Sequence, residues 1–219
     1  ISEVNQELEA FSYTISHDLR APLRHITSFS GKLEQQILRS SSPDEKSLHY
    51  LDTIKSSAAR LSLLIDDLLA YSKLGRHALR TRLIDMEAMV NDVYDMLETD
   101  HRGRKIKFEV SPLPSLHCDE SLMRQVWQNL LSNALKYTQG VYETHIQVSA
   151  VREGDFYTFS VKDNGAGFDP RYANKLFGIF QRLHKPSEFS GSGIGLAITK
   201  RVIERHGGTV SAESIVNGG

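Results

Sequence analysis

The sequence predicts a helical hairpin that dimerises into a four-helix bundle, followed by an α/β sandwich. Two observations lead to this fold class. Over residues 1 to about 75, apolar side chains recur every three or four positions, which is the spacing of amphipathic helices. Further along the chain, helical stretches alternate with short runs in which every second residue is apolar, a mixture typical of a sheet covered by helices.

Composition and charge exclude several classes of protein. The chain has 219 residues, with 26 Lys and Arg against 27 Asp and Glu, so its formal net charge of −1 argues against a nucleic-acid partner. It contains no run of ~18 apolar residues, so no membrane span is expected in this segment. The single cysteine, Cys118, excludes an intramolecular disulfide and favours a reducing, cytoplasmic location. Because residue 1 is isoleucine and the last residues are turn-like, we expect a piece of a longer polypeptide.

The helical part divides into two helices at residues 40–43. Ser42 is expected to cap the second helix, with Pro43 in its first turn. In the second helix apolar residues alternate at steps of three and four, as in a heptad seam: Leu51, Ile54, Ala58, Leu61, Ile65 and Leu68. A single hairpin leaves much of this stripe bare, so we expect residues 1–76 to form a homodimer that buries it.

Residues 77–219 are expected to form the second domain, entered through a basic hinge at residues 75–82. Its predicted elements, in chain order, are a helix at 87–97, strands at 106–110 and 116–118, a helix capped by Asp119, a hairpin of strands at 145–151 and 156–161, a helix at 195–206 and a strand at 209–215.

The first candidate site residues are His17 and Asp18, in the predicted first helix. Pro22 follows them, so a kink is expected just beyond His17. A neighbouring carboxylate can hold one imidazole nitrogen as N–H and make the other a better nucleophile. A His-Asp pair is also common on exposed helix faces, so this segment alone leaves both interpretations open.

The second candidate is a polar stripe on the helix after Asp119. The spacing i, i+4, i+7, i+8 places Asn129, Asn133, Lys136 and Tyr137 on one face. Carboxamide oxygens can ligate Mg²⁺ and an ammonium group binds phosphate, so the stripe suits a cation together with phosphate oxygens. The alternative is a solvated face, but such faces usually carry Glu–Lys pairs, and asparagine lowers helix propensity.

The third candidate is the turn that follows the predicted strand at 156–161. Asp163 can accept a hydrogen bond from a ligand amine, and Gly165 and Gly167 allow the backbone to approach a flat base closely. Taken alone, a simple Asp-Asn-Gly turn is the commoner explanation.

The last candidates surround a glycine-rich loop that leads into a helix, with Gly191, Gly193 and Gly195. Free N–H groups at the start of that helix attract phosphate, although the spacing matches neither a dinucleotide fingerprint nor a Walker A loop. Upstream, two aromatic residues precede Arg182 and a polar stretch. This stretch is either a mobile flap over the ligand or a surface loop pinned into the core by Phe177 and Phe180.

Taken together and in this order, the segments resemble the transmitter module of two-component sensor histidine kinases. Residues 16–23 resemble the H-box of that family, 129–137 the N-box, 163–167 the first G-box, 177–182 the F-box and 191–196 the second G-box. Residues 5–13 and 179–184 are similar to phytochrome-type and PAS-linked kinases, and a bacteriophytochrome is the leading candidate for the parent protein.

The resemblance implies an ATP-binding sandwich of the Bergerat type and ATP-dependent autophosphorylation. It makes His17 the phosphoacceptor, with Asp18 accepting its proton or orienting the ring. It implies that Arg182 stabilises charge on the transferred γ-phosphoryl group. The implied ATP ligands are Asn129 for Mg²⁺, Asn133 for the metal or phosphates, Lys136 for phosphate, Tyr137 and Asp163 for adenine, and the pocket-shaping Gly165, Gly167, Gly191, Gly193 and Gly195.

The resemblance also implies partners: a response regulator whose receiver-domain aspartate takes the phosphoryl group, and an N-terminal sensor domain in the full-length chain. Two departures matter. Ala21 stands where many relatives have Thr or Asn, which position water for dephosphorylating the regulator. The family's closing strand, similar to Gly-Ser-Thr-Phe, is not found before Gly219, so the sandwich is expected to lack its last strand. Alternatives are a transmitter acting mainly as a phosphatase, which Ala21 disfavours, and a non-catalytic dimerisation scaffold, which the intact motifs disfavour.

Overall fold

The chain folds into two compact units, Ile1–His77 and Ala78–Gly219. The computed structural model describes residues 3–38, 44–74, 78–101, 103–185, 188–189, 191–216 and 218–219. Among the helices in these ranges, none has the length and apolar character needed to cross a membrane.

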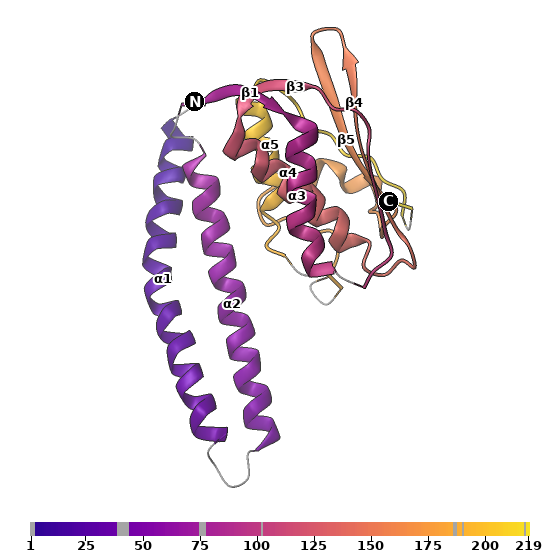
Figure 1. Ribbon diagram of the computed structural model, residues 1–219. Helices are drawn as coiled ribbons and strands as arrows, with labels where there is room; N and C mark the ends of the chain where they lie inside the picture. The colour runs from indigo at the N-terminus through magenta and orange to yellow at the C-terminus, as the bar shows by residue number, and fades with distance from the viewer. Residues whose placement is uncertain are drawn as a thin grey trace. The chain divides into compact units, whose positions relative to one another are not determined.

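The first unit is a hairpin of two long helices that lie side by side, α1 (Glu3–Leu38) and α2 (Glu45–Lys73) (Figure 1). The periodic apolar residues of the two helices meet in a buried cluster formed by Leu23, Ala58, Ile65 and Leu69. The helix α1 continues through Pro22. The hairpin therefore follows from the three-and-four spacing of its apolar side chains.

The cap of α2 differs from the prediction. Asp44 has an extended backbone, and its carboxylate accepts hydrogen bonds from the amides of Lys46 (3.2 Å) and Ser47 (3.3 Å). The prediction that Ser42 caps this helix was wrong, because Asp44 supplies two acceptor oxygens immediately before the first turn. Ser42 and Pro43 themselves lie outside the described residues.

A stripe of large apolar side chains on α1 remains exposed in the single chain. Ile26 is 46% exposed, Phe29 66% and Leu33 48%. An apolar stripe of this kind on a long helix is typical of helices that pack against a further partner. It is the surface that the predicted homodimer would bury.

The second unit contains a three-stranded and a two-stranded sheet. In the larger sheet, β4 (Thr144–Glu153) pairs in parallel with β2 (Ile106–Val110) and antiparallel with β5 (Phe156–Asp163). In the smaller one, β1 (Thr81–Asp85) pairs antiparallel with β3 (Ser115–Asp119). The helices α3 (Met86–Glu98), α4 (Glu120–Tyr137) and α5 (Gly195–Arg205) lie on the same side of the larger sheet (Figure 1). The predicted α/β sandwich is thus confirmed.

The helix α4 is at the centre of this unit, in contact with α3, α5 and the larger sheet. Its N-cap is Asp119, as predicted, whose carboxylate accepts from the Leu122 amide at 3.3 Å. One face is buried and apolar, with Met123, Val126, Trp127, Leu131, Ala134 and Leu135. Trp127 meets Phe159 of β5 edge to face at 5.8 Å between ring centroids. Because one face fills the core, the polar residues on the other face are left for a ligand.

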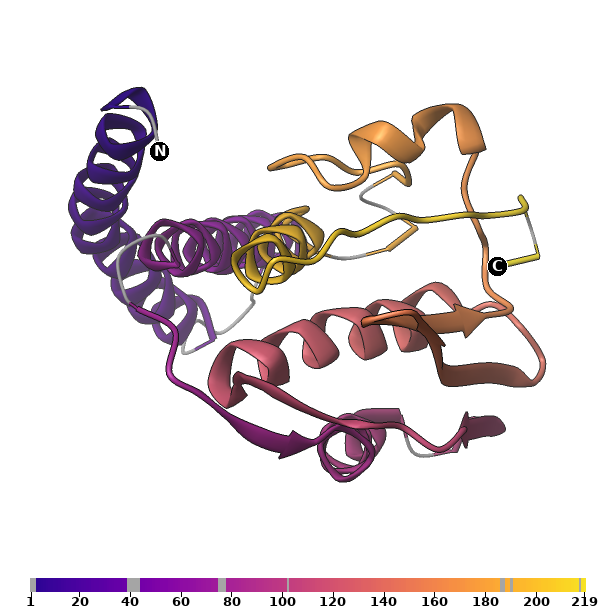
Figure 2. The ribbon, with the colours of Figure 1, turned by 90° about the horizontal axis from the view of Figure 1, so that it is seen from above.

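Two predicted features of the second unit are wrong. Residues 81 and 82 belong to β1 and not to a hinge, because β3, more than 30 residues further along the chain, supplies their ladder partners; the hinge residues 75–77 lie outside the described part. Residues 209–215 do not form a strand, because alternation alone makes no ladder and no described segment pairs with them. Figure 2 shows this stretch, in yellow, as an extended trace without a strand arrow.

Arg104 holds the C-terminal end of α4. Its Nη1 donates to the Leu135 carbonyl (2.8 Å), and its Nη2 donates to the Thr138 carbonyl (2.8 Å) and to the Thr144 hydroxyl (2.7 Å). The last carbonyls of a helix have no partner within it, and charge-assisted bonds are the stronger kind of hydrogen bond. Arg104 therefore joins the end of α4 to the start of β4.

We expect Arg104→Met to lower the free energy of unfolding of the second unit by about 2–3 kcal/mol, because two helix-end carbonyls lose their charged donor. Chemical denaturation followed by circular dichroism measures this loss. Arg171→Met is the matched control, since Arg171 pairs with Asp169 while 82% of its side chain is exposed, and it should change stability by no more than about 0.5 kcal/mol. Equal effects of the two substitutions would contradict the role given to Arg104.

Candidate functional site

His17 and Asp18 lie on α1, whose backbone is helical through both residues. Their side chains, and that of Ala21, lie outside the described part of the structure. The roles given to these residues therefore remain predictions.

The polar face of α4 meets the start of α5 through Asn129. The Asn129 Nδ2 donates to the Gly195 carbonyl at 2.9 Å. A Cβ added to Gly195 would lie only 3.3 Å from Asn129 Oδ1, so the absence of a side chain at Gly195 permits this close approach. With Nδ2 engaged, Oδ1 is the atom that Asn129 offers to a ligand, and an amide oxygen suits a hard cation.

Lys136 brings positive charge to the same face. Its Nζ donates to Asn133 Oδ1 at 3.0 Å and lies 4.3 Å from the centroid of the Tyr137 ring. A Cβ added to Gly191 would lie 3.3 Å from this Nζ, which places the glycine-rich loop beside the ammonium group. Burial lowers the pKa of Lys136, and the charge of Arg182 lowers it further. Two cations held together in this way favour an anionic ligand.

Asp163 stands at the end of β5, at the start of the loop 163–168. Its Oδ1 accepts from the Gly165 amide at 2.9 Å, and the next amide, that of Ala166, donates to the Tyr137 carbonyl at 3.1 Å. A Cβ added to Gly165 would lie 2.6 Å from that carbonyl oxygen, so only glycine fits between α4 and the loop. Burial raises the pKa of Asp163, against the opposing effect of the Gly165 amide.

Three aromatic rings lie against one another beside Lys136. Tyr137 is 5.0 Å from Phe189 and 5.3 Å from His184 between ring centroids, and His184 is 5.1 Å from Phe189. The guanidinium of Arg182 donates to the Phe189 carbonyl. The sequence suggested only a flap or a surface loop for this stretch. The one signal for this cluster in the sequence was that two aromatic residues, His184 and Phe189, lie close together in it.

The structure brings the predicted residues of the second unit into a chain of contacts. Asn129 touches Gly195 and Lys136 approaches Gly191, as described above. Gly193 adopts a φ of 77°, and a Cβ there would lie 2.8 Å from the Gln181 carbonyl and 3.1 Å from Arg182 Cγ. Helix α4 therefore contacts both the loop 163–168 and the loop before α5, and the latter loop contacts the Arg182 segment.

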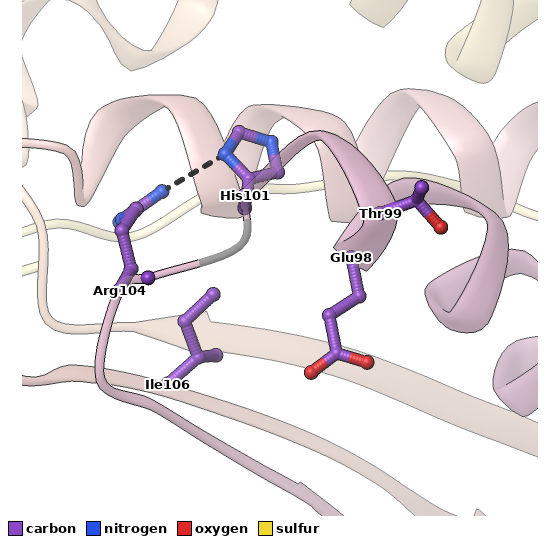
Figure 3. Close-up of a pocket in the computed structure, with 6 residues that line it drawn as sticks. Glu98, Thr99, His101, Arg104 and Ile106 are labelled. Atoms are coloured by element: carbon purple, nitrogen blue, oxygen red, sulfur yellow. Dashed lines mark hydrogen bonds between the residues drawn. The ribbon is translucent and has the colours of Figure 1, made fainter.

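A separate cavity of about 350 Å³ lies where the 3₁₀ turn Thr99–His101 leads into β2. It is lined by Glu98, Thr99, His101, Gly103, Arg104 and Ile106. Figure 3 shows Arg104 directed toward His101, at 3.3 Å between Nη1 and Nδ1. No predicted site residue lines this cavity, and the Arg104 guanidinium is already engaged by carbonyl and hydroxyl oxygens. The geometry therefore favours the surroundings of α4 as the functional site.

Two family models match successive parts of the chain. Residues 7–77 match the family described as the His Kinase A (phospho-acceptor) domain. Residues 118–219 match the family described as histidine kinase-, DNA gyrase B-, and HSP90-like ATPase. The phytochrome-like protein Cph1 of Synechocystis sp. is 33% identical over 210 residues, which cover 96% of this chain and 28% of that protein. The chain thus spans between a quarter and a third of the length of such relatives.

Solved structures have the same fold. Full-length ShkA in complex with AMPPNP superposes with a TM-score of 0.68 at 26% identity, over 95% of this chain and 43% of that one. The histidine kinase ThkA in complex with the response regulator protein TrrA superposes with a TM-score of 0.65 at 19% identity, over 98% of this chain and 61% of that one.

We expect Asp163→Asn to stabilise the second unit at neutral pH, by up to about 1 kcal/mol, because an amide avoids the burial of a carboxylate. Burial raises the pKa of Asp163 in the folded state above the ordinary value of 3.8. The advantage of the variant should therefore be absent below that ordinary value, where the carboxyl is neutral in both states, and grow as pH rises through the folded pKa.

Thermal unfolding of both proteins across this pH range measures the effect. Asp155→Asn, in the exposed turn between β4 and β5, is the control and should show no such trend. A difference in stability between Asp163→Asn and the parent protein that stays constant with pH would contradict the raised pKa of Asp163.

Proposed function

From the premise that this chain belongs to the histidine kinase family, we propose that it is the output part of a sensor kinase. It transfers the γ-phosphoryl group of ATP to His17, and from there to an aspartate on the receiver domain of a response regulator. The observation that supports this proposal is that α4, which carries Asn129 and Lys136, contacts both the loop that begins with Asp163 and the glycine-rich loop before α5. One positively charged end and one carboxylate end match the phosphates and the base of ATP.

The phosphate end is formed by cations and glycines. Lys136 and Arg182 provide positive charge for the triphosphate, with Arg182 placed to stabilise the charge that develops on the γ-phosphoryl group. Asn133 orients Lys136 through the bond to its Nζ. The loop with Gly191, Gly193 and Gly195 leads into α5, whose first amides have no partner within the helix and attract phosphate oxygens.

The base end is formed by Asp163 and Tyr137. The Asp163 carboxylate accepts a hydrogen bond from the exocyclic amine of adenine, while the Tyr137 ring packs on the base. Gly165 and Gly167 allow the backbone to approach the flat ring. This assignment is supported by the half-buried position of Asp163 and by the Gly165 amide, which donates to its carboxylate.

The amide oxygen of Asn129 suits Mg²⁺, because Oδ1 remains available to ligate while Nδ2 donates to the Gly195 carbonyl. When bound, Mg²⁺ neutralises charge on the phosphates and helps to orient them. Asn129 is the residue of this chain that would hold the ion, together with phosphate oxygens of ATP and water.

The transfer itself is a substitution at phosphorus. An imidazole nitrogen of His17 forms a bond to the γ-phosphorus, the bond from that phosphorus to the β,γ-bridging oxygen breaks, and ADP leaves with the electron pair. Asp18 takes or orients the imidazole proton. In the second step the receiver aspartate attacks the phosphorus, the P–N bond breaks and His17 is restored.

The remaining features of the proposal concern assembly. Residues 1–76 form the dimerisation and phosphotransfer hairpin, and residues 77–219 belong to the ATP-binding domain. A homodimer buries the exposed stripe of α1. The full-length protein carries an N-terminal sensor domain and works in the cytoplasm, as befits a chain similar to phytochrome-like proteins.

We expect His17→Gln to abolish acid-labile ³²P incorporation from γ-labelled ATP, because glutamine cannot form the phosphoryl–nitrogen bond, while ATP binding stays unchanged. The measurement is filter-bound label before and after acid treatment. His25→Gln, an exposed residue of the same helix, serves as the control and should keep its label. A His17→Gln protein that still took up acid-labile label would sink the assignment of the phosphoacceptor.

We expect Asn129→Ala to remove the dependence of ATP affinity on Mg²⁺. In the unmodified protein Mg²⁺ should strengthen binding by about tenfold or more over binding in EDTA, because Asn129 would hold the ion and the ion would neutralise charge on the phosphates. Calorimetric titration with ATP, in Mg²⁺ and in EDTA, compares Asn129→Ala with the unmodified protein. Asn91→Ala, on the exposed face of α3, is the control and should keep the Mg²⁺ effect. The account fails on this point if Asn129→Ala keeps the full Mg²⁺ effect.

A further inference from the structure

The last residues of the chain form a turn around one carbonyl group. The Gly219 carbonyl accepts from the Ile215 amide (2.8 Å) and from the Ser214 hydroxyl (3.1 Å). The Gly218 amide donates back to the Ile215 carbonyl at 2.9 Å. We call the described residues 214–216 and 218–219 the C-terminal turn.

The C-terminal turn packs directly on the loop 163–168. The Phe168 amide donates to Ser214 Oγ at 2.7 Å. Gly167 has a φ of 58°, and a Cβ on it would collide with the Ile215 carbonyl. A Cβ on Gly219 would likewise collide with the Asp163 carbonyl. Both glycines are therefore required by close approach of the two backbones.

The loop is thus held from two sides. The Ala166 amide is bound by the Tyr137 carbonyl of α4, the Gly165 amide by the Asp163 carboxylate, and the Phe168 amide by Ser214. The Ser214 hydroxyl acts both as an acceptor, from the Phe168 amide, and as a donor, to the Gly219 carbonyl. Alanine can do neither, whereas threonine can do both.

We propose that Ser214 is a positioning residue that sets the base selectivity of the nucleotide site. The inference rests on the proposed function, in which Asp163 receives the adenine amine. Ser214 fixes the far end of the loop that begins with Asp163, and so fixes the direction of that carboxylate. A fixed carboxylate accepts from the amine of adenine and repels the carbonyl oxygen that replaces it in hypoxanthine.

The experiment compares ATP with ITP, which differs at this position of the base by carrying a carbonyl in place of the amine. Dissociation constants of both nucleotides are measured on the full chain with Mg²⁺ for the parent protein and for Ser214→Ala and Ser214→Thr. We expect the parent protein to prefer ATP by about tenfold to a hundredfold. Ser214→Ala should lose most of this preference, while Ser214→Thr should keep it.

Two further measurements separate positioning from a general loss of structure. Inorganic tripolyphosphate, which has no base, should bind Ser214→Ala and the parent protein alike. Ser160→Ala is the matched control, since the exposed Ser160 hydroxyl bonds Ser149 at 2.8 Å on β4, away from the loop, and its selectivity should equal that of the parent.

The outcomes distinguish this inference from the proposed function. A parent protein that binds ATP and ITP equally would overturn the role of Asp163 and, with it, the role of Ser214. A selective parent protein whose selectivity survives in Ser214→Ala would overturn the role of Ser214 alone. If Ser214→Ala loses tripolyphosphate binding as well, Ser214→Thr decides, and loss of selectivity there also overturns the inference.

Discussion

The second unit depends on the hydrogen bonds that Arg104 donates to the last turn of α4. A helix end leaves carbonyl groups without partners within the helix, and here residues from elsewhere in the unit donate to them. Arg104 takes the carbonyls of Leu135 and Thr138, and the Tyr137 carbonyl between them accepts from Ala166 of the loop 163–168. One turn of helix therefore connects the core, the start of β4 and the loop that carries Asp163. Lys136 and Tyr137 lie on this same turn, so the hydrogen bonds at the end of the helix also position these two residues.

Lys136 and Asp163 are both partly buried, and burial shifts their pKa values in opposite directions. Burial lowers the pKa of Lys136 and raises the pKa of Asp163, so each group is pushed toward its neutral form. In the proposed complex with ATP, phosphate oxygens beside Lys136 and an amine beside Asp163 would favour the charged forms again. Such binding would offset the free-energy cost of burying the two charges in the unliganded fold. The apolar face of α4, with Trp127 and Leu131 in the core, supplies the stability that makes this tolerable.

Much of the fold, and of the site, could be predicted where the information is local. The spacing of apolar residues gives both hairpin helices, Asp119 marks the start of α4, and the interval from Asn129 to Lys136 places the polar side chains on one face. Features that depend on distant partners could not be found in this way. β1 exists because β3 supplies its ladder, and residues 209–215 alternate without any described partner to pair with. Arg104 gave no signal, since its role depends on carbonyl groups more than 30 residues away. The same is true of Ser214, whose contact with Phe168 spans 46 residues.

The contacts of the loop 163–168 hold it in place in the nucleotide-free protein. Hydrogen exchange of single amides, followed by NMR on the nucleotide-free chain, tests it most directly. The structure predicts that the amides of Gly165, Ala166 and Phe168 are protected, since each has an acceptor in the fold. The amide of Gly154, in the exposed turn between β4 and β5, provides the unprotected reference. Protection of the three loop amides well above that of Gly154 is the predicted result, and exchange as fast as at Gly154 would contradict the account.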